Sequence, residues 1–523
     1  MGVEIESICG GKGTCGKCKV AIVQGEIAGE YESDNSVLAC KSYTTEEDLV
    51  VDVPEQPLDI FDRIETIDER ISDHVKAFNI NAENLLKTPL ITCNEANVQP
   101  VDKENIVDDA ARLLQSLHIE ETQLLLNKSL LQKIPLVLSE NQKFYYTLFS
   151  QNKTTRLIDI SHESIKVYGL AIDCGTTSIS VYLINCKTGN IEALISGYND
   201  QISCGLDVIS RINYSKTPER LRDVQNRVVR SINRLIDKLL HKQDVRADQV
   251  AGVYVAGNTI MMHLLYGVQA DTVRLDPYVP VFLTMPVHRA KDLQISVNDN
   301  AVVRISPAIG AYVGGDITAG LLATEVYKEE EISLFIDIGT NGELVVGNKD
   351  FMFACACSAG PAFEGGGIYH GMRATTGAIS QVKIDTATGK PTCTVIGKGK
   401  PDGICGSGMI DLIAELLKTG LIDNKGMLNF EKGCDYIEKK GCRAVYYVDE
   451  AKEIFVSQLD IENIMRAKAA IFSATLLLLQ HIGISTQELK QVYIAGGFGK
   501  GLDLDNAIHI GLFPDITRDK YLY

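Results

Sequence analysis

This chain of 523 residues has no apolar run long enough to cross a membrane, and its N-terminus lacks the basic and then apolar pattern of a secretory signal. It also lacks a surplus of positive charge, since 51 Lys and Arg residues stand against 68 Asp and Glu residues and the net charge is −17. An acidic chain repels phosphate groups, so we expect neither nucleic acid nor an anionic membrane as a partner. We therefore predict a cytoplasmic location.

Histidine is scarce, and the nine histidines show no spacing typical of metal ligands. We interpret nearly all of them as structural or exposed. Ten of the fourteen cysteines are scattered along the chain and read as buried thiols. The other four gather near the N-terminus with the spacing C-x5-C-x2-C-x21-C, and they are Cys9, Cys15, Cys18 and Cys40.

The spacing of these four cysteines is that of a [2Fe–2S] ferredoxin, with a first gap one residue longer than the plant type. The glycines between them let the backbone curl around a cluster and aim N–H groups at its sulfurs. The alternative is a structural zinc site. Zinc ribbons usually show two C-x2-C pairs, whereas this segment has one, so the sequence favours the cluster.

The predicted fold class is a multidomain chain that mixes α/β and α+β parts. Residues 1–54 read as a ferredoxin-like β-grasp domain with strands at 19–23 and 48–53. Only eight residues precede Cys9, where a ferredoxin sheet normally has a hairpin and the start of a helix. We therefore expect either a truncated module or a true start that lies upstream. Residues 55–100 mix charge, proline and short apolar pieces and are predicted to be a linker with a short helix or two.

Residues 101–167 are predicted to form a small α/β middle domain. An amphipathic helix is expected over 101–121, where the spacing of the apolar residues places them on one face. That face comprises Ile106, Ala110, Leu113, Leu114 and Leu117. Strands are expected at KIPLVLSE (133–140) and KTTRLIDI (153–160).

Residues 168–523 contain an internal repeat. GLAIDCGTTSISVYLI (169–184) is similar to LFIDIGTNGELVVG (334–347), and VYVAGNT (253–259) is similar to VYIAGGFG (492–499). Each first member reads as a strand, a turn and a strand, and each second member reads as a buried strand that leads into a glycine turn and a helix. The repeat predicts two similar α/β lobes around a cleft.

The turns of the repeat are predicted to bind ATP with Mg²⁺. Each first member has a strand that ends in Asp, and the carboxylates of Asp173 and Asp337 can hold a hydrated Mg²⁺. Glycines allow close approach of the phosphates, and hydroxyl and N–H groups donate to their oxygens. The predicted nucleotide contacts are Gly175, Thr176, Thr177, Gly257, Asn258, Gly339, Thr340, Asn341, Gly342, Gly496 and Gly497. The candidate catalytic residues are Asp173, Asp337 and Glu343. Ordinary hairpin turns are the alternative.

With these motifs, the chain resembles the reductive activators of corrinoid-dependent enzymes, which join an N-terminal ferredoxin to an ATPase domain of the acetate and sugar kinase/Hsp70/actin (ASKHA) type. The resemblance rests on the cysteine spacing and on six further motifs. These are DVISRI (207–212), AGNT (256–259), DIGTNGE (337–343), AGPAFEG (359–365), GICGSG (403–408) and AGGFG (495–499).

The resemblance implies an ASKHA domain over 168–523 and an ATP-dependent reductase. It would pass an electron from the [2Fe–2S] cluster to Co(II) and so regenerate Co(I). It further implies a corrinoid protein of a methyltransferase system and an external electron donor as partners, and a homodimer formed through the C-terminal region. The chain has no D-x-H-x-x-G run, by which many corrinoid-binding proteins resemble one another, so the cobalt is expected on another protein.

Two other functions stay open from the sequence. One is a nucleotide-switched binding module without redox activity, in which the ferredoxin segment is a relic. The other is a small-molecule kinase of the same fold, although a kinase needs a base for its substrate and the sequence shows no convincing candidate. Glu364 can orient a water for hydrolysis, but a solvated glutamate in a loop is the simpler interpretation.

Overall fold

The computed structural model divides the chain into two compact units. The C-terminal unit comprises Met1–Pro57, Gln201–Tyr214 and Gly320–Tyr523, and the central unit comprises Leu58–Asp200 and Ser215–Ala319. The residues that the structure describes are 18–28, 31–32, 36–44, 48–53, 63–65, 87–98, 101, 104, 106–117, 126–138, 143–151, 154–205, 207–339, 341–432, 434–440, 443–449, 451–496 and 501–523. None of the helices in these ranges combines the length and apolar character needed to cross a membrane.

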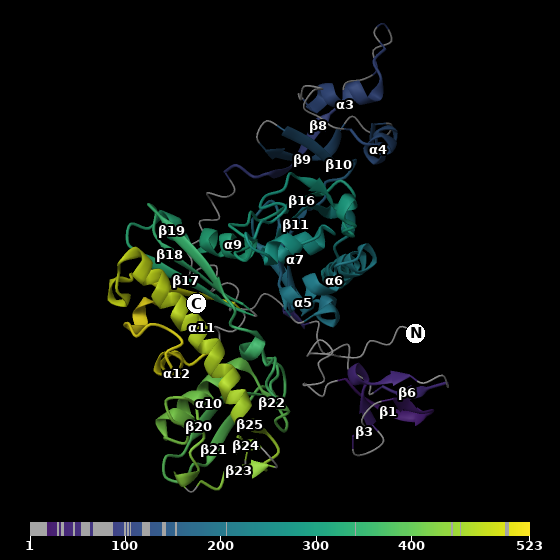
Figure 1. Cartoon of the computed structure of the whole chain (residues 1–523). Coiled ribbons are helices and arrows are strands. Elements are labelled where there is room, and N and C mark those ends of the chain that lie inside the picture. Colours follow the sequence, from purple (N-terminus) through teal and green to yellow (C-terminus); the bar gives the residue numbers. More distant parts are fainter. Residues whose placement is uncertain are drawn as a thin grey trace. The chain divides into compact units, whose positions relative to one another are not determined.

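A small antiparallel sheet follows the cysteine-rich N-terminus (Figure 1). Its strand order is β3-β4-β1-β6, and its apolar residues Val20, Ile22, Ile27 and Val37 are buried together. The strands are β1 (Lys19–Gln24), β3 (Tyr31–Glu32), β4 (Ser36–Leu38) and β6 (Val50–Asp52), with a separate pair of β2 (Ile27–Ala28) and β5 (Tyr43–Thr44). The two predicted strands correspond to β1 and β6.

The middle domain has three antiparallel strands in the order β10-β9-β8, packed against two helices. The elements are β8 (Ile91–Asn97), β9 (Lys143–Gln151), β10 (Thr154–Ser161), α3 (Asp109–Leu117) and α4 (Lys128–Leu138). The predicted strand at 153–160 is confirmed as β10. The predicted strand at 133–140 is wrong, because most of it lies in α4 and buries Ile134 and Val137. Ile106 precedes α3 and is 81% exposed, so it does not share the buried face.

The region 55–100, which we predicted to be a linker, contributes strands to two sheets. β7 (Arg63–Glu65) pairs with the edge of the main sheet of the central unit, and β8 belongs to the middle domain. Each of these strands forms its backbone hydrogen bonds with the edge strand of a sheet, and that edge strand comes from another part of the chain. The composition of the segment alone does not reveal that edge.

The main sheet of the central unit has the strand order β15-β16-β14-β11-β12-β13-β7. β11 runs parallel to β14 and antiparallel to β12, and α6 packs against β12 and β13. The strands are β11 (Tyr168–Cys174), β12 (Ser178–Asn185), β13 (Ile191–Tyr198), β14 (Val250–Ala256), β15 (His288–Arg289) and β16 (Val302–Ile305). The helices of this unit are α6 (Pro218–Lys242), α7 (Thr259–Leu265), α8 (Asp271–Arg274) and the first half of α9 (Gly315–Thr324). Helix α5 (Val208–Tyr214) belongs to the C-terminal unit.

The C-terminal unit repeats this sheet strand by strand. Its order β19-β18-β17-β26-β27 corresponds to β13-β12-β11-β14-β16, with the same parallel and antiparallel pairs. The register also agrees, since Asp173 lies opposite Ala256 and Asp337 lies opposite Ala495. The strands are β17 (Ser333–Ile338), β18 (Gly342–Gly347), β19 (Met352–Cys357), β26 (Val492–Ala495) and β27 (Tyr521–Leu522). The predicted internal repeat is confirmed.

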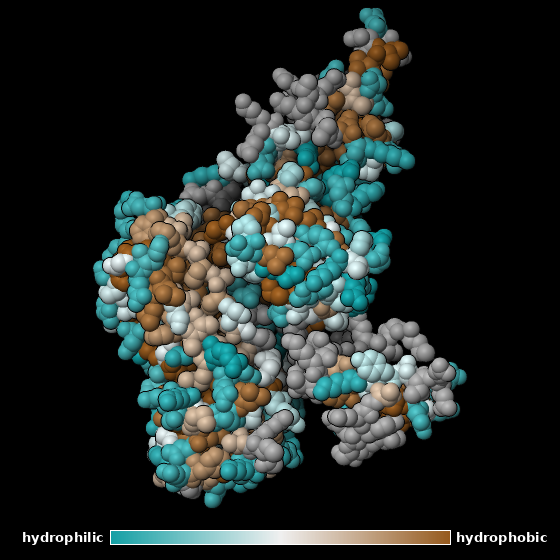
Figure 2. Space-filling view, viewed as in Figure 1, coloured by the Kyte–Doolittle hydropathy of each residue, from teal (hydrophilic) through white to brown (hydrophobic). Residues whose placement is uncertain are grey.

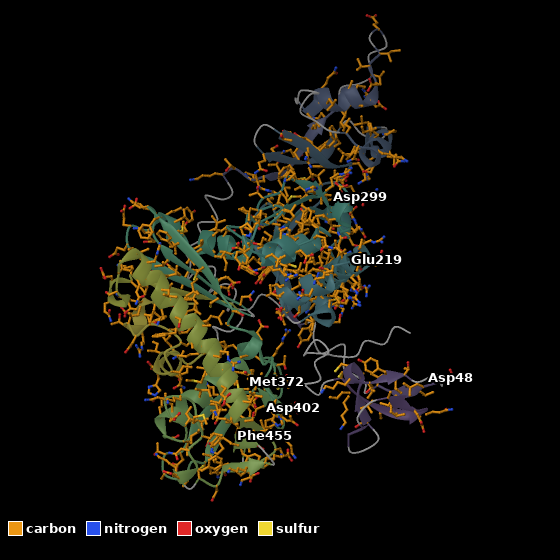
Figure 3. All side chains as sticks on the ribbon, in the orientation of Figure 1. Asp48, Glu219, Asp299, Met372, Asp402 and Phe455 are labelled. Atoms are coloured by element: carbon orange, nitrogen blue, oxygen red, sulfur yellow. The ribbon has the colours of Figure 1, made fainter. Side chains whose placement is uncertain are left out.

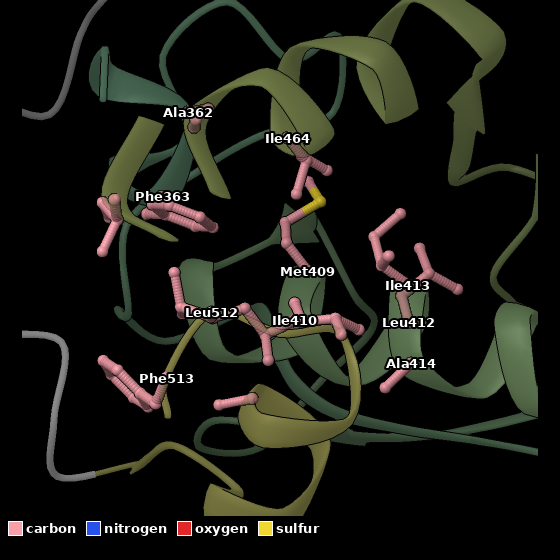
Figure 4. Packing of buried hydrophobic residues seen from close by; sticks show 14 of the residues in the cluster. Ala362, Phe363, Met409, Ile410, Leu412, Ile413, Ala414, Ile464, Leu512 and Phe513 are labelled. Carbon is pink, nitrogen blue, oxygen red and sulfur yellow. The ribbon is translucent and has the colours of Figure 1, made fainter. Parts of the chain in front are cut away.

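The rest of the C-terminal unit packs helices and two small sheets around one large apolar core. Figure 4 shows part of this core, where Met409 and Ile410 of α10 lie among Phe363, Ile464 and Leu512. The helices are α10 (Gly406–Lys418), α11 (Gln458–Ile482) and α12 (Leu504–His509). The strands are β20 (Ala378–Ile384), β21 (Pro391–Val395), β22 (Gly403–Ile404), β23 (Ile437–Lys440), β24 (Arg443–Tyr447) and β25 (Phe455–Ser457).

Candidate nucleotide-binding site

In the central unit, Asp173 ends β11 beside a tight glycine turn. The turn leads through Gly175, Thr176 and Thr177 into β12. Asn199 is fully buried and holds this turn, because its side-chain amide donates to the Gly175 carbonyl (3.0 Å) and its backbone N–H donates to the Thr177 carbonyl (3.1 Å). Asn199 begins the polar segment NDQISCGLD (199–207) that follows β13. The structure thus shows that Asn199 fixes the turn that follows Asp173.

A second turn packs directly against the first. A Cβ at Gly257 would lie 2.7 Å from the Cys174 carbonyl oxygen, so only glycine lets the end of β14 approach the end of β11. Asn258 then caps α7 by accepting from the N–H of Ile260 (3.0 Å). Its amide also donates to the Tyr312 carbonyl (3.1 Å). The predicted residues Gly257 and Asn258 are therefore adjacent to the Asp173 turn.

A second carboxylate, which the sequence motifs did not reveal, joins this site. Asp316 stands at the start of α9, and the N–H of the preceding Gly315 donates to the Gly257 carbonyl (2.9 Å). A Cβ at Gly314 would lie 2.5 Å from the Asn258 Cα, so the two backbones are in close contact. The signal in the sequence was Gly-Gly-Asp at the start of a helix. Its partner turn lies more than fifty residues earlier in the chain.

Asp173 and Asp316 are close enough to influence each other's ionisation. Solvent reaches the Asp173 carboxylate, yet desolvation by the protein around it and the negative charge of Asp316 raise its pKa to about 6. Desolvation also raises the pKa of Asp316 to about 6, against the opposing effect of a hydrogen bond from the Ile317 N–H. Two carboxylates in such a position favour a cation between or beside them, because a cation relieves their repulsion.

In the C-terminal unit, Asp337 holds the position that Asp173 holds in the central unit. Gly496 follows β26 with φ +96°, and a Cβ there would lie 2.5 Å from the Ile338 carbonyl and 2.9 Å from the Asp337 Oδ1. The backbone after β26 therefore runs directly against the Asp337 carboxylate. The N–H of Gly339 donates to the Asn341 carbonyl (3.0 Å), which closes the turn between β17 and β18. Gly342 is the first residue of β18.

Two glutamates approach the Asp337 turn. Glu343 pairs with Asp337 across β17 and β18, and its side chain is only 6% exposed. Glu364 lies beside the turn, since a Cβ at Gly339 would lie 3.6 Å from its Oε1. The solvated-loop interpretation of Glu364 is therefore wrong. The short helix Pro361–Glu364 is anchored in the core by Ala362 and Phe363, and this anchoring holds Glu364 half-buried near the turn.

The GICGSG motif leads into α10, and Gly501 lies beside it. Cys405 is the N-cap residue of α10, and a Cβ at Gly501 would lie 3.6 Å from the Ser407 Oγ. The first N–H groups of a helix are oriented for an anion. The structure therefore brings Gly501 close to the GICGSG segment within one unit, a contact that sequence alone did not reveal.

Four predicted site residues lie outside the described residues, namely Cys9, Cys15, Thr340 and Gly497. Of the predicted cluster ligands, Cys18 is buried and Cys40 is half-buried. The N–H of Ala39 donates to the Cys18 carbonyl (2.9 Å), so the chain segments of Cys18 and Cys40 are neighbours, as a shared cluster requires. Within the described ranges no group of three or more His, Cys, Asp or Glu residues could hold a metal ion.

Cys355 and Cys357 form a C-x-C pair on β19, and both are packed against the core. Desolvation, with Glu343 nearby, raises the pKa of Cys355 to about 11 and that of Cys357 to about 12. Burial therefore disfavours the thiolate form of both groups, which is the form that binds metals. The pair is a structural feature of the strand.

Comparison with known families accounts for most of the chain. Residues 168–329 match the RACo middle region, which is a different segment from the middle domain of residues 101–167 described above. Residues 331–523 match the C-terminal domain of RACo, the ASKHA domain. We had predicted one ASKHA domain over 168–523, whereas the two matches divide that range.

Two curated proteins and one solved structure are similar to the chain. Corrinoid activation enzyme RamQ of Eubacterium limosum is 31% identical over 534 residues, which are 99% of this chain and 85% of that protein. The Co(II) methylated amine-specific corrinoid protein reductase of Methanosarcina barkeri is 26% identical over 67% of each chain. A solved reductive activator for corrinoid, iron-sulfur protein is 36% identical with a TM-score of 0.76, and the match covers 99% of this chain and 86% of that one.

Proposed function

This chain belongs to the RACo family, and from that premise we propose that it uses ATP to drive one electron onto the Co(II) ion of a separate corrinoid protein. The relatives are named for the activation or reduction of corrinoid proteins, which supports a corrinoid protein as the partner. The electron would come from a [2Fe–2S] cluster on Cys9, Cys15, Cys18 and Cys40, and would be replaced by an external donor.

One observation carries the nucleotide part of this proposal. Asp173 and Asp337 occupy the same register position in two equivalent sheets, and each lies against a glycine turn that follows the neighbouring parallel strand. A single Asp–Gly turn is common in hairpins, whereas a matched pair of this kind is suited to Mg²⁺ and phosphate oxygens. In this proposal Asp173 and Asp337 would hold hydrated Mg²⁺. Asp316 beside Asp173, and Glu343 and Glu364 beside Asp337, would orient water.

ATP has a clear thermodynamic purpose in such a reaction. A plant-type [2Fe–2S] cluster supplies an electron near ~−400 mV. Each ~59 mV of uphill transfer lowers the equilibrium yield tenfold for one electron, so a cobalt centre that is harder to reduce would stay mostly as Co(II). Binding and hydrolysis of ATP would alternate the chain between two states, one of which favours the docked corrinoid protein.

The test is a reduction assay with the iron-loaded chain, a Co(II) corrinoid protein, a chemical reductant and MgATP. We expect the absorption spectrum of Co(I) to appear with ATP and to stay absent with ADP. Loaded iron and measurable ATP hydrolysis without any Co(I) would overturn the proposal. An iron-free chain that still binds ATP would instead favour the nucleotide-switched binding module, and a phosphorylated metabolite would favour the kinase.

A further inference from the structure

Helix α6 carries a charge opposite to that of the chain. Its 25 residues include seven Lys and Arg residues and three Asp and Glu residues, a net charge of +4, while the whole chain has −17. One side of α6 packs on β12 and β13. Figure 2 shows hydrophilic side chains over the region where Figure 1 labels α6, and Figure 3 labels Glu219 in its first turn. The positive charge is therefore presented to solvent by the other side.

The basic residues of this side follow one another at intervals of seven, three, four and four residues. They are Arg220, Arg227, Arg230, Arg234 and Lys238. Such intervals place side chains in one stripe, which runs over 19 residues and about 27 Å of helix, since the 18 steps each rise 1.5 Å. A stripe of that length fits the face of a protein and exceeds what a small anion can contact.

A groove opens beside the middle of the stripe, with a volume of about 520 Å³. α6 forms one side of it, and Gln294 and Ser296 form the other. Asn233 fastens the two sides together, because its amide donates to the Gln294 carbonyl (2.8 Å) and its Oδ1 accepts from the Ser296 N–H (2.9 Å). The groove is therefore built into the fold.

Arg230 is the cation that this groove offers to a ligand. Arg234 also lines the groove, but it is already paired with both oxygens of Asp200 (3.0 Å each). Arg230 lies on the exposed face of α6, and no carboxylate among the described residues pairs with it. The groove lining holds one carboxylate, Asp237, beside the two guanidinium groups of Arg230 and Arg234. A guanidinium fork matches a carboxylate, and the amides of Asn226 and Gln294, which also line the groove, suit the peptide groups of an extended segment.

We propose that the α6 groove, with Arg230 at its centre, docks an acidic segment of the corrinoid protein. This proposal rests on the proposed function, which requires a protein partner to bind and leave in each cycle. Because this chain is strongly acidic, another acidic protein is repelled by most of its surface and attracted by the α6 stripe. The stripe would therefore set both the place and the rate of encounter.

The test compares Arg230→Glu with Lys425→Glu, an equal change of charge. Lys425 is an exposed residue in the turn 423–426 of the C-terminal unit, and its side chain has no ion-pair partner among the described residues. The first readout is the binding of a fluorescein-labelled poly-glutamate peptide to the full chain, at low and at physiological salt. We expect Arg230→Glu to weaken binding about tenfold and Lys425→Glu to change it less than twofold.

The second readout is the ATP-dependent reduction of a Co(II) corrinoid protein. We expect Arg230→Glu to raise the KM for the corrinoid protein about tenfold while kcat and ATP binding stay unchanged. If wild type reduces the corrinoid protein and the KM of Arg230→Glu is normal, the docking proposal is overturned and the proposed function stands. If wild type reduces no corrinoid protein, the proposed function fails, and so does the identity of the partner. Equal weakening of peptide binding by both variants also overturns the docking site, since only net charge would then matter.

Discussion

If the Asp173 turn binds a nucleotide as proposed, the ionisation of its carboxylates should control that binding. The pKa of Asp173 is raised to about 6 by desolvation and by Asp316, so its carboxylate is protonated below that pH and is then unable to hold Mg²⁺. We expect kcat/KM for MgATP hydrolysis to fall as the pH falls through about 6. The pH dependence of kcat/KM reports the pKa values of essential groups in the free enzyme. Asp316→Asn removes the like charge and should move this midpoint to lower pH.

The control for this measurement is Asp299→Asn. It removes one negative charge from the same unit, at an exposed site paired with Lys291 (3.3 Å), and should leave the midpoint unchanged (Figure 3 labels Asp299). A midpoint that shifts equally in both variants would show that net charge, and no local contact, governs the titration. If neither variant moved the midpoint, Asp316 would have no influence on the group whose titration controls hydrolysis.

Gly496 gives a second prediction about a single residue. A methyl group in Gly496→Ala would meet the Ile338 carbonyl at 2.5 Å and the Asp337 carboxylate at 2.9 Å, at a φ of +96°. We expect a loss of about 1–3 kcal/mol in the free energy of unfolding and at least a tenfold weaker affinity for MgATP, measured by calorimetry. Gly483→Ala is the matched control, because Gly483 has φ +73° and open space around its Cβ position.

The comparison of these two variants separates backbone strain from damage to the site. Both variants place alanine in the left-handed region, so both should lose some stability. Only Gly496→Ala should lose nucleotide affinity. If Gly483→Ala weakened ATP binding as much, the contact between Gly496 and Asp337 would have no special part in the site.

The strands and helices of the repeat were predictable because the same short sequence pattern occurs in both halves of residues 168–523. Asp173 and Asp337 each follow an apolar run and precede a glycine, which marks the end of a buried strand wherever it pairs. α4 was missed for the opposite reason. The segment 133–140 is rich in Ile, Val and Leu, and its helical spacing appears only when Leu130, Ile134 and Val137 are read together.

The middle domain is docked on the main sheet of the central unit by a polar cluster. Asp159 of β10 is 6% exposed and accepts from Lys133 of α4 (2.6 Å), from Asn298 (3.1 Å) and from its neighbour's N–H. We expect Asp159→Ala to cost about 2 kcal/mol, because it leaves the buried Asn298 amide short of an acceptor. Hydrogen exchange of β9 and β10 should become faster, and calorimetry should show a lower melting temperature.

The exposed ion pair of Asp299 with Lys291 supplies the control for this element. Asp299→Ala breaks a surface pair and should change stability by less than about 0.5 kcal/mol. Steady-state ATP hydrolysis should be retained by both variants, since neither residue touches the Asp173 turn in the structure. A stability loss equal to that of Asp159→Ala would mean that the polar cluster adds nothing beyond an ordinary surface pair.

Across the whole chain, the predictable part is the part repeated in sequence. The two sheets, their shared register and the carboxylates at their strand ends follow from short motifs. What could not be predicted depends on contacts between distant segments, such as the pairing of β7 with β13 or the approach of Asp316 to Asp173. A motif reports the local backbone, whereas such contacts depend on which edges and turns the rest of the fold leaves available.

The proposed coupling predicts that electron transfer and ATP hydrolysis can be lost separately, and that losing either one stops Co(I) formation. Cys18→Ser replaces a buried thiol by a group of similar size, and it removes one proposed ligand of the cluster. We expect this variant to lose visible iron–sulfur absorption and Co(I) formation while MgATP still binds normally. Asp337→Asn should do the reverse, with a normal cluster spectrum, at least a hundredfold slower ATP hydrolysis and no Co(I).

Cys93→Ser is the matched control for Cys18→Ser, because Cys93 is an exposed cysteine of β8 and should be neutral in every assay. A mixture of the Cys18→Ser and Asp337→Asn chains tests the coupling directly. If one polypeptide must hold both the cluster and the working nucleotide turn, the mixture stays inactive. Co(I) formed by the mixture would show that the two functions can be supplied by separate chains, and direct coupling within a single chain would then be wrong.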